Sequence, residues 1–151
     1  MKCKLVLCLS AVILLSTLMA GCGSRGDSSV PVKVQNADRV QTLAFNLMFD
    51  SSVLEVKGVY VTSLTLHSTA QWVMEATGRL LVLLSEGDIS GDGNLVTVVF
   101  KILKSQGSSA LTVEVKQATS KGTGSLETQT SAGSFTGSDS SFKAPVITFI
   151  E

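Results

Sequence analysis

Short runs in which apolar and polar residues alternate one by one recur along most of this chain, and they constrain its fold more than any other feature. Val30, Val32 and Val34 are the apolar members of one run, and Val96 and Val98 belong to another. A period of two places successive side chains on opposite faces of a β-strand. Turn residues separate these runs at intervals of roughly ten residues, which is typical of two packed sheets. The sequence therefore predicts an all-β fold.

Two segments in the middle of the chain carry local signals. Residues 71–76 and 79–85 flank Thr77-Gly78 and are predicted to form a β-hairpin. A helix over residues 69–75 that ends before Gly78 is the alternative. Residues 87–94 are rich in glycine and are expected to form a loop.

The first 21 residues have the anatomy of a bacterial secretory signal. Lys2 and Lys4 supply a basic start, residues 5–18 are apolar, and Ala20 and Gly21 are small. The apolar stretch is shorter than the about 20 residues that a membrane-spanning helix needs. We expect residues 1–21 to be removed and residues 22–29 to form a flexible tether before the folded domain.

Cys22 is the expected site of lipid attachment. The run from Leu18 to Cys22 resembles a bacterial lipobox, in which the cysteine thiol is acylated and becomes the first residue of the mature protein. This resemblance implies secretion across the inner membrane and a lipid anchor at the outer membrane or cell surface. Because Cys3 and Cys8 would leave with the signal, no disulfide is expected. An ordinary signal peptide or a short membrane anchor is the alternative.

Charge and motif content argue against several function classes. The chain carries 12 basic and 12 acidic residues and no basic stripe, so nucleic acid is not an expected partner. His67 is the only histidine, and no metal site or cofactor is expected. Residues 88–94 mimic the start of an EF-hand loop, but Val99 stands where the bidentate glutamate belongs. A turn is the favoured interpretation.

No catalytic constellation stands out either. The chain has no Gly-x-Ser-x-Gly elbow. Glu75, Glu86, Asp88 and Asp92 lack the aromatic-lined cleft expected around a glycosidase carboxylate pair. The protein is therefore not expected to be an enzyme.

Three blocks of the chain, in order, resemble the cohesin family. Residues 43–56 are an alternating strand followed by a turn at Asp50 and then Val-Leu-Glu. Residues 89–101 are a Gly-Asp-Gly turn leading into a strand that ends in Phe, and residues 133–136 match the final block. The resemblance spans about residues 30–137 and implies a two-sheet jelly-roll sandwich of about eight or nine strands. Its best-known members bind dockerin modules of polysaccharide-degrading enzymes.

The chain departs from that family in two respects. Thr42 and Ala44 stand where cellulosomal cohesins have an Asn and an Asp that contact dockerin. No counterpart of the family's first strand is expected. In the tail, residues 138–151, we expect residues 146–150 to form a strand that covers the vacant edge. A disordered tail is the alternative.

A candidate partner-binding face follows from strand parity together with the resemblance. Parity assigns Phe45, Leu47, Phe49, Leu80, Val82, Leu84, Val96, Val98 and Phe100 to the core. The opposite parity exposes Asn46, Met48, Leu81, Leu83, Thr97 and Val99. The family's strand order implies that the three strands carrying these residues lie side by side. Covering of Leu81 and Leu83 by a loop or by the tail is the alternative.

These observations lead to one hypothesis and two alternatives. The hypothesis is a lipid-anchored, cohesin-like module that holds a protein partner, dockerin-type or other, at the cell surface, with a link to polysaccharide degradation. One alternative is a carbohydrate-binding module of the same fold, with Trp72 and Tyr60 as its only tryptophan and tyrosine. The other is a structural subunit of a surface assembly.

Overall fold

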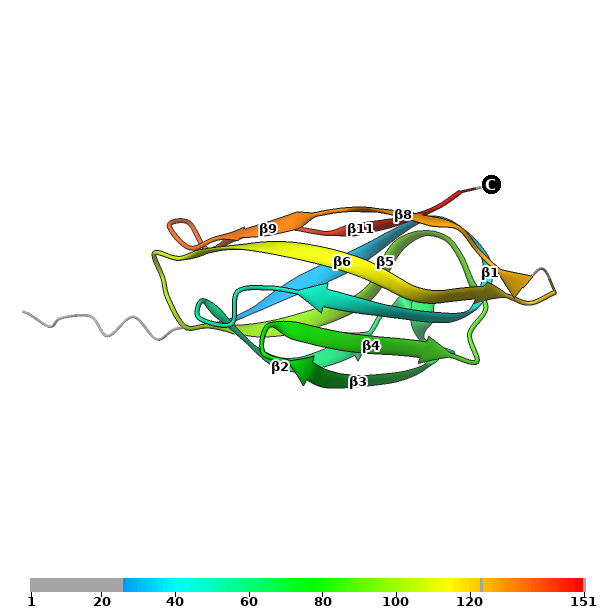
Figure 1. The fold of residues 1–151 in the computed structure, drawn as a ribbon, viewed down its shortest axis with the longest axis horizontal. Helices are drawn as coiled ribbons and strands as arrows, with labels where there is room; N and C mark the ends of the chain where they lie inside the picture. The colour runs from blue at the N-terminus through cyan, green and yellow to red at the C-terminus, as the bar shows by residue number, and fades with distance from the viewer. Residues whose placement is uncertain (1–25, 123, 151) are drawn as a thin grey trace, which may run out of the picture.

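The structure is a computed structural model that describes residues 26–122 and 124–150, and its strands lie in two facing layers (Figure 1). Cys22 and the rest of the expected signal and lipidation segment lie outside the described residues. In chain order the strands are β1 (Asp27–Met48), β2 (Leu54–Val61), β3 (Thr69–Ala76), β4 (Arg79–Ser85), β5 (Ile89–Ile102), β6 (Ser108–Ser120), β7 (Gly124–Ser125), β8 (Thr128–Ser131), β9 (Gly133–Thr136), β10 (Ser141–Lys143) and β11 (Val146–Phe149). A 3-10 turn, η1 (Ser63–Thr65), joins β2 to β3.

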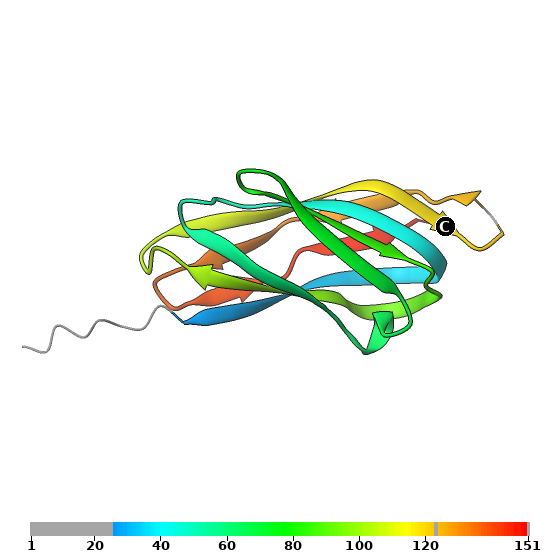
Figure 2. The same ribbon diagram turned by 90° about the horizontal axis from the view of Figure 1, so that it is seen from below.

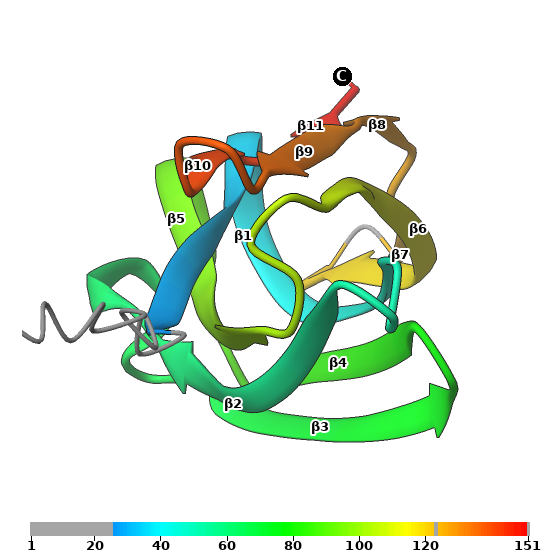
Figure 3. The same cartoon turned by 90° about the vertical axis from the view of Figure 1, so that its left-hand side faces the viewer.

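The long strand β1 belongs to both layers. Its first part, from Asp27 to Val40, pairs with β5, while its last part, residues 43–48, pairs with β4 on one side and β6 on the other. The first layer therefore has the order β3–β4–β1–β6–β9–β10, and the second has the order β2–β5–β1–β11–β8. Figure 3 looks along the sandwich and shows β4 and β6 on one side and β5 on the other. This architecture confirms the predicted all-β sandwich.

β1 changes layers through bulges, and polar side chains of β5 stabilise them. Asn36 and Arg39 have positive φ angles of 56° and 45°, which are uncommon for residues other than glycine. Asp92 Oδ1 accepts a hydrogen bond from the Asn36 backbone N–H at 2.7 Å, and Ser90 Oγ accepts one from that of Arg39 at 3.0 Å. The expected loop at residues 87–94 is therefore mostly wrong, because β5 already begins at Ile89 and pairs with the bulged part of β1.

The core lies between the layers and has the predicted parity. Val30, Val32 and Val34 of β1 are buried, and so are all nine side chains assigned to the core from the sequence. The rings of Phe49 and Phe100 meet edge to face with centroids 5.2 Å apart, an arrangement that aromatic pairs favour. The alternation of apolar and polar residues along each strand thus corresponds to one buried and one outward side of that strand.

The predicted hairpin is confirmed as β3 and β4, and the alternative helix over residues 69–75 does not form. Gly78 in the connecting turn has a φ of 73°, and a side-chain Cβ at this position would come within 2.5 Å of the Phe49 carbonyl oxygen. The Gly78 carbonyl also accepts a hydrogen bond from the Phe49 N–H at 2.9 Å. Glycine is required here both for its backbone conformation and for this close approach.

Both ends of the domain differ from the sequence-based expectation. β1 starts at Asp27, so residues 27–29 are strand rather than tether, and the expectation that the first strand is missing is wrong. β11 pairs in parallel with β1, through Lys33 and Val146, and on its other side with β8. Figure 2 shows β11 running beside the first part of β1. The predicted strand at residues 146–150 is therefore confirmed as β11, and the tail is not disordered. It does not cover a vacant edge, because β11 lies between two strands.

None of the described helical segments is long and apolar enough to cross a membrane.

Candidate protein-binding face

We define the outer face as the outward side of the first layer, formed by β3, β4, residues 43–48 of β1, and β6. Strand register places its residues in rows across the sheet. One row contains Val73, Leu81, Asn46 and Glu114. A second row contains Gln71, Leu83, Ala44 and Gln117, and Met48 lies between Arg79 and Thr112 in a third. Four of the six residues predicted for the partner-binding face are thus brought together: Asn46, Met48, Leu81 and Leu83.

The end of the outer face nearest β3 is apolar and hollowed. Leu81 and Leu83 are half-buried, and Val73 beside them is 54 % exposed. Together with Gln71 and Trp72 they line a shallow depression of about 150 Å³. Their covering by the tail does not occur, because β11 lies in the second layer. Exposed apolar surface in a concave patch is suited to an apolar side chain of a partner.

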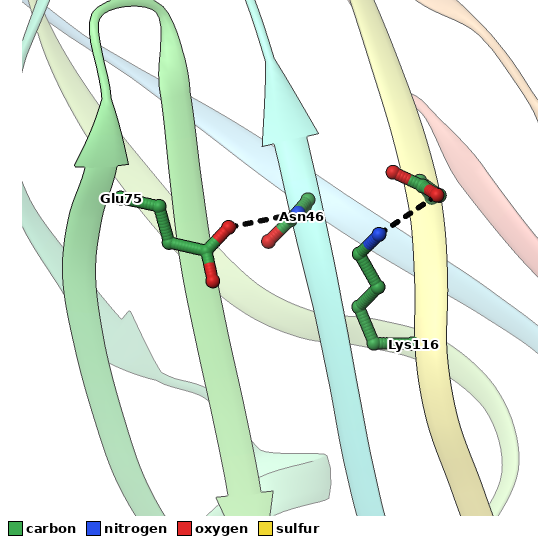
Figure 4. Close-up of polar contacts among 4 residues, drawn as sticks. Asn46, Glu75 and Lys116 are labelled. Atoms are coloured by element: carbon green, nitrogen blue, oxygen red, sulfur yellow. Dashed lines mark hydrogen bonds and ion pairs between the residues drawn. The ribbon is translucent and has the colours of Figure 1, made fainter.

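Asn46 is not exposed as parity predicted. Its side chain is fully buried on the outer face because the neighbouring strands crowd it, and its Nδ2 donates a hydrogen bond to Glu75 Oε2 at 3.1 Å (Figure 4). Asn46 Oδ1 has no hydrogen-bond partner in the described structure. Glu75 rather than Asn46 therefore presents the polar group at this point of the face.

A charged pair borders Asn46 on the side of β6. Lys116 Nζ lies 2.8 Å from Glu114 Oε1, as the dashed line beside Lys116 shows in Figure 4. The hydrogen bond from Lys116 lowers the pKa of the Glu114 carboxyl below its usual 4.5, and the positive charges of Lys116 and Arg79 act in the same direction. Glu114 is thus ionised at neutral pH. The outer face grades from an apolar depression on β3 and β4 to a charged edge on β6.

Thr97 and Val99 do not belong to this face. Both lie on β5, where Thr97 is paired between Pro31 and Tyr60, and Val99 between Ser29 and Gly58. β5 is in the second layer, so their side chains point outward on the side of the sandwich opposite the outer face. The predicted side-by-side arrangement of the three strands is wrong for β5. Parity had placed these residues outward correctly, but it carries no information on which layer a strand joins.

The sequence reading missed the contribution of β3. Gln71, Val73 and Glu75 extend the outer face beyond β4, although no role on that face was assigned to them. The available signal was the hairpin itself: once residues 71–76 pair with β4, alternation places Gln71 and Val73 beside Leu83 and Leu81. Lys116 was missed because β6 was not expected to lie beside β1 on this face, although alternation with Thr112 and Glu114 already places Lys116 on one side of its strand.

The remaining chemical candidates have structural roles or stand alone. Asp92 and Ser90 accept backbone hydrogen bonds from β1, and both lie within strand β5, so this segment forms neither the expected turn nor an EF-hand loop. His67 is exposed just after η1. Among the described residues, no three His, Cys, Asp or Glu side chains are grouped so as to hold a metal ion.

Comparison with known sequences gives a consistent relationship. A family model described as Cohesin domain matches residues 26–137. Cellulose-binding protein A of Clostridium cellulovorans is 29% identical over 104 residues, which are 64% of this chain and 6% of that protein. The chain thus spans a small part of the length of this relative.

Solved structures share the fold. A non-cellulosomal cohesin from the hyperthermophilic archaeon Archaeoglobus fulgidus aligns with a TM-score of 0.54 at 26% identity, covering 85% of this chain and 83% of that one. A Clostridium acetobutylicum domain, CaCohA2, gives a TM-score of 0.57 at 18% identity, with 82% of each chain covered. A type I cohesin–dockerin complex from Clostridium thermocellum aligns with a TM-score of 0.51 at 16% identity, covering 84% of this chain and 90% of that one.

Proposed function

Because the chain belongs to the cohesin domain family, we propose that it is a binding module that holds a dockerin-type protein partner on its outer face. The observation that carries this proposal is the apolar depression formed by Val73, Leu81 and Leu83. Fully desolvated apolar pockets near the centre of an interface supply most of the binding free energy, while polar groups around them set orientation. Glu75 and the Glu114–Lys116 pair are suited to this second role.

The dockerin class of partner is supported by the family relationship and not by conserved contact residues. A related structure contains a cohesin together with a dockerin, but Thr42 and Ala44 here replace the polar pair expected from the family resemblance. The depression beside β3 offers apolar rather than hydrogen-bonding contact. We therefore expect a partner surface with an aliphatic side chain at its centre, and specificity different from that of cellulosomal pairs.

The test compares Leu83→Lys with Val99→Lys. Both substitutions place a lysine at a half-buried, outward-facing position of a strand, but only Leu83 lies on the outer face. Dockerin modules encoded in the same genome are titrated calorimetrically into each variant. Leu83→Lys should weaken binding at least tenfold, because a charge would be buried in the interface, while Val99→Lys should bind as the unmodified domain does.

Circular dichroism melting provides the control for folding, since both variants should melt within a few degrees of the unmodified domain. Equal loss of binding in the two variants would contradict the assignment of the face, and so would no loss in either. Retention of the domain on insoluble polysaccharide, with no binding to any dockerin, would favour the carbohydrate-binding alternative instead.

We further propose that acylated Cys22 anchors the module to the outer membrane or cell surface. The proposal is supported by the lipobox resemblance and by the start of β1 at Asp27, five residues after Cys22. Five extended residues span at most about 18 Å, so the domain would lie close to the bilayer. β1 begins at one end of the long axis (Figure 1), which would leave the outer face along the side accessible to a partner.

The anchor is tested by Cys22→Ser in the full chain. We expect the unmodified protein in the membrane fraction, with an acyl mass on its N-terminal peptide. The variant should lose that mass, because it has no thiol to acylate. It should then either leave the washed membrane fraction or be stranded there with residues 1–21 still attached, since two or more acyl chains are needed for stable lipid anchoring. Unchanged fractionation together with an unmodified N-terminus in the natural chain would contradict lipidation.

A further inference from the structure

β3 is an edge strand whose outer backbone groups face away from β4. Within the described residues it pairs with β4 alone. It forms the lower rim of the molecule in Figures 1 and 3. An unpaired strand edge presents a row of backbone donors and acceptors that another strand can join.

Over residues 71–74, the composition of β3 does not protect this edge. Trp72, Val73 and Met74 are 43 %, 54 % and 41 % exposed, and the strand contains neither lysine nor proline. The corresponding edge strand of the second layer, β2, carries Lys57 and a bulge between Val56 and Gly58. Lysines and bulges are the usual means by which natural sheets discourage edge pairing. β3 has its bulge near its end, after Met74, so residues 71–74 are left regular.

We propose that two copies of this chain pair through β3, antiparallel and centred on Val73, to form a closed dimer. A two-fold axis perpendicular to the sheet makes the contact self-complementary, so each copy uses the same residues. Opposite residues must have the same parity, because the outer face of one copy continues into that of the other. Centring on Val73 satisfies this condition.

Side-chain chemistry selects this register over its neighbours. With Val73 facing Val73 of the second copy, Trp72 faces Met74 within the regular segment, and Gln71 comes next to Glu75 at the bulge, each contact occurring twice. An amide next to a carboxylate is a hydrogen-bonding pair, and sulfur–aromatic contacts are favourable. Centring on Met74 would place Val73 opposite Glu75, and centring on Trp72 would place Gln71 opposite Val73. Both alternatives set a polar side chain against an apolar one.

The dimer would join two outer faces in one continuous layer. The depressions lined by Val73, Leu81 and Leu83 would then lie on either side of the shared strands and point in the same direction. Such a dimer presents two binding faces to one side, which favours bivalent capture of partners. Dimerisation requires no partner protein, so its test is independent of the proposed function.

Disulfide trapping tests the register directly. Residues 26–151 contain all the described strands and no cysteine, so single cysteines can be introduced without background. Opposite residues of an antiparallel pair have Cα atoms roughly 4.5 to 5.5 Å apart, within the about 4.4 to 6.8 Å that a disulfide spans. Val73→Cys should therefore form a dimer under mild oxidation. Trp72→Cys and Met74→Cys, both in the regular segment, should form one efficiently only when the two variants are mixed.

Val61→Cys, on the exposed edge strand β2, is the matched control and should cross-link at least tenfold more slowly than Val73→Cys. Sedimentation equilibrium of the unmodified domain should show a concentration-dependent dimer. Val73→Lys should be monomeric because like charges would oppose each other, and Gln71→Lys should dimerise more tightly by coming next to Glu75. A monomer at all concentrations, equal cross-linking at positions 61 and 73, or a dimer insensitive to Val73→Lys would overturn the proposal.

Discussion

At the scale of single residues, Asn46 is the most unusual feature of the domain. A fully buried asparagine lies in a row with Val73 and Leu81, its Nδ2 bound to Glu75 and its Oδ1 without a partner in the described structure. Leaving a buried acceptor unpaired costs about 1 to 3 kcal/mol, whereas a hydrogen bond returns about 0.5 to 1.5 kcal/mol. The unpaired Oδ1 therefore costs more free energy than the hydrogen bond of Nδ2 returns, so Asn46 destabilises the folded state.

This imbalance predicts that Asn46→Val stabilises the domain. Valine favours strands and has no polar group to satisfy, so the free energy of unfolding should rise by about 1 kcal/mol. Urea denaturation measures this change. The slope of the unfolding free energy against urea concentration should be the same in both proteins.

Glu75→Ala supplies the control. It removes the acceptor of Asn46 Nδ2 and should destabilise the natural domain, but it should have little effect in the Asn46→Val background. Additive effects in the double variant would mean that the two side chains are not coupled, contrary to their 3.1 Å contact.

At the scale of elements, β11 contributes more than a terminal strand usually does. It pairs with β1 and β8, and Ile147 and Phe149 are buried while Thr148 points outward. The Pro145 carbonyl also accepts a hydrogen bond from the Lys33 N–H at 3.0 Å. Burying two large apolar side chains contributes about 1.5 to 3 kcal/mol each. Removal of β11 would therefore separate β8 from β1 in the second layer, whereas loss of an edge strand would leave the other pairings intact.

The contribution of β11 is measured by comparing Ile147→Ala with Thr148→Ala. Ile147→Ala should lower the free energy of unfolding by about 2 to 5 kcal/mol because it leaves a cavity between the layers. Thr148→Ala, one residue further along, should change it by less than about 1 kcal/mol. Similar small effects in chemical denaturation of both variants would show that β11 is not part of the cooperative fold.

At the scale of the whole molecule, β1 makes the two layers one unit. Its first part is hydrogen-bonded within the second layer, and its last part within the first layer. Neither layer can lose its central strand without removing the same strand from the other. The sandwich should consequently unfold in a single cooperative step.

Calorimetry checks this coupling. The domain should show one thermal transition whose calorimetric and van't Hoff enthalpies agree. Leu47→Ala in the first layer and Leu95→Ala in the second, both at fully buried positions, should each move the whole transition and cost about 2 to 5 kcal/mol. Two separable transitions, or a variant that affects only part of the unfolding enthalpy, would disprove the coupling.

The sequence by itself determined the properties that depend on neighbouring residues. Period-two alternation separated the buried Phe45 and Leu47 from the outward side of β1, and Thr77-Gly78 marked the hairpin. Both follow from local backbone geometry, since successive strand residues point in opposite directions and a positive φ favours glycine. These signals were sufficient for the fold class and for deciding which side chains of each strand point outward.

Only the tertiary structure decided which strands are neighbours. Val99 faces outward as predicted, yet it belongs to the other layer because β5 pairs with β2 and the first part of β1. Asn46 follows the outward parity and is still buried, because the crowding around it comes from strands distant in sequence. β11 pairs with a segment more than 100 residues earlier, through Lys33 and Val146. Parity is a property of one strand, whereas pairing and burial are properties of several strands together, and no local pattern encodes them.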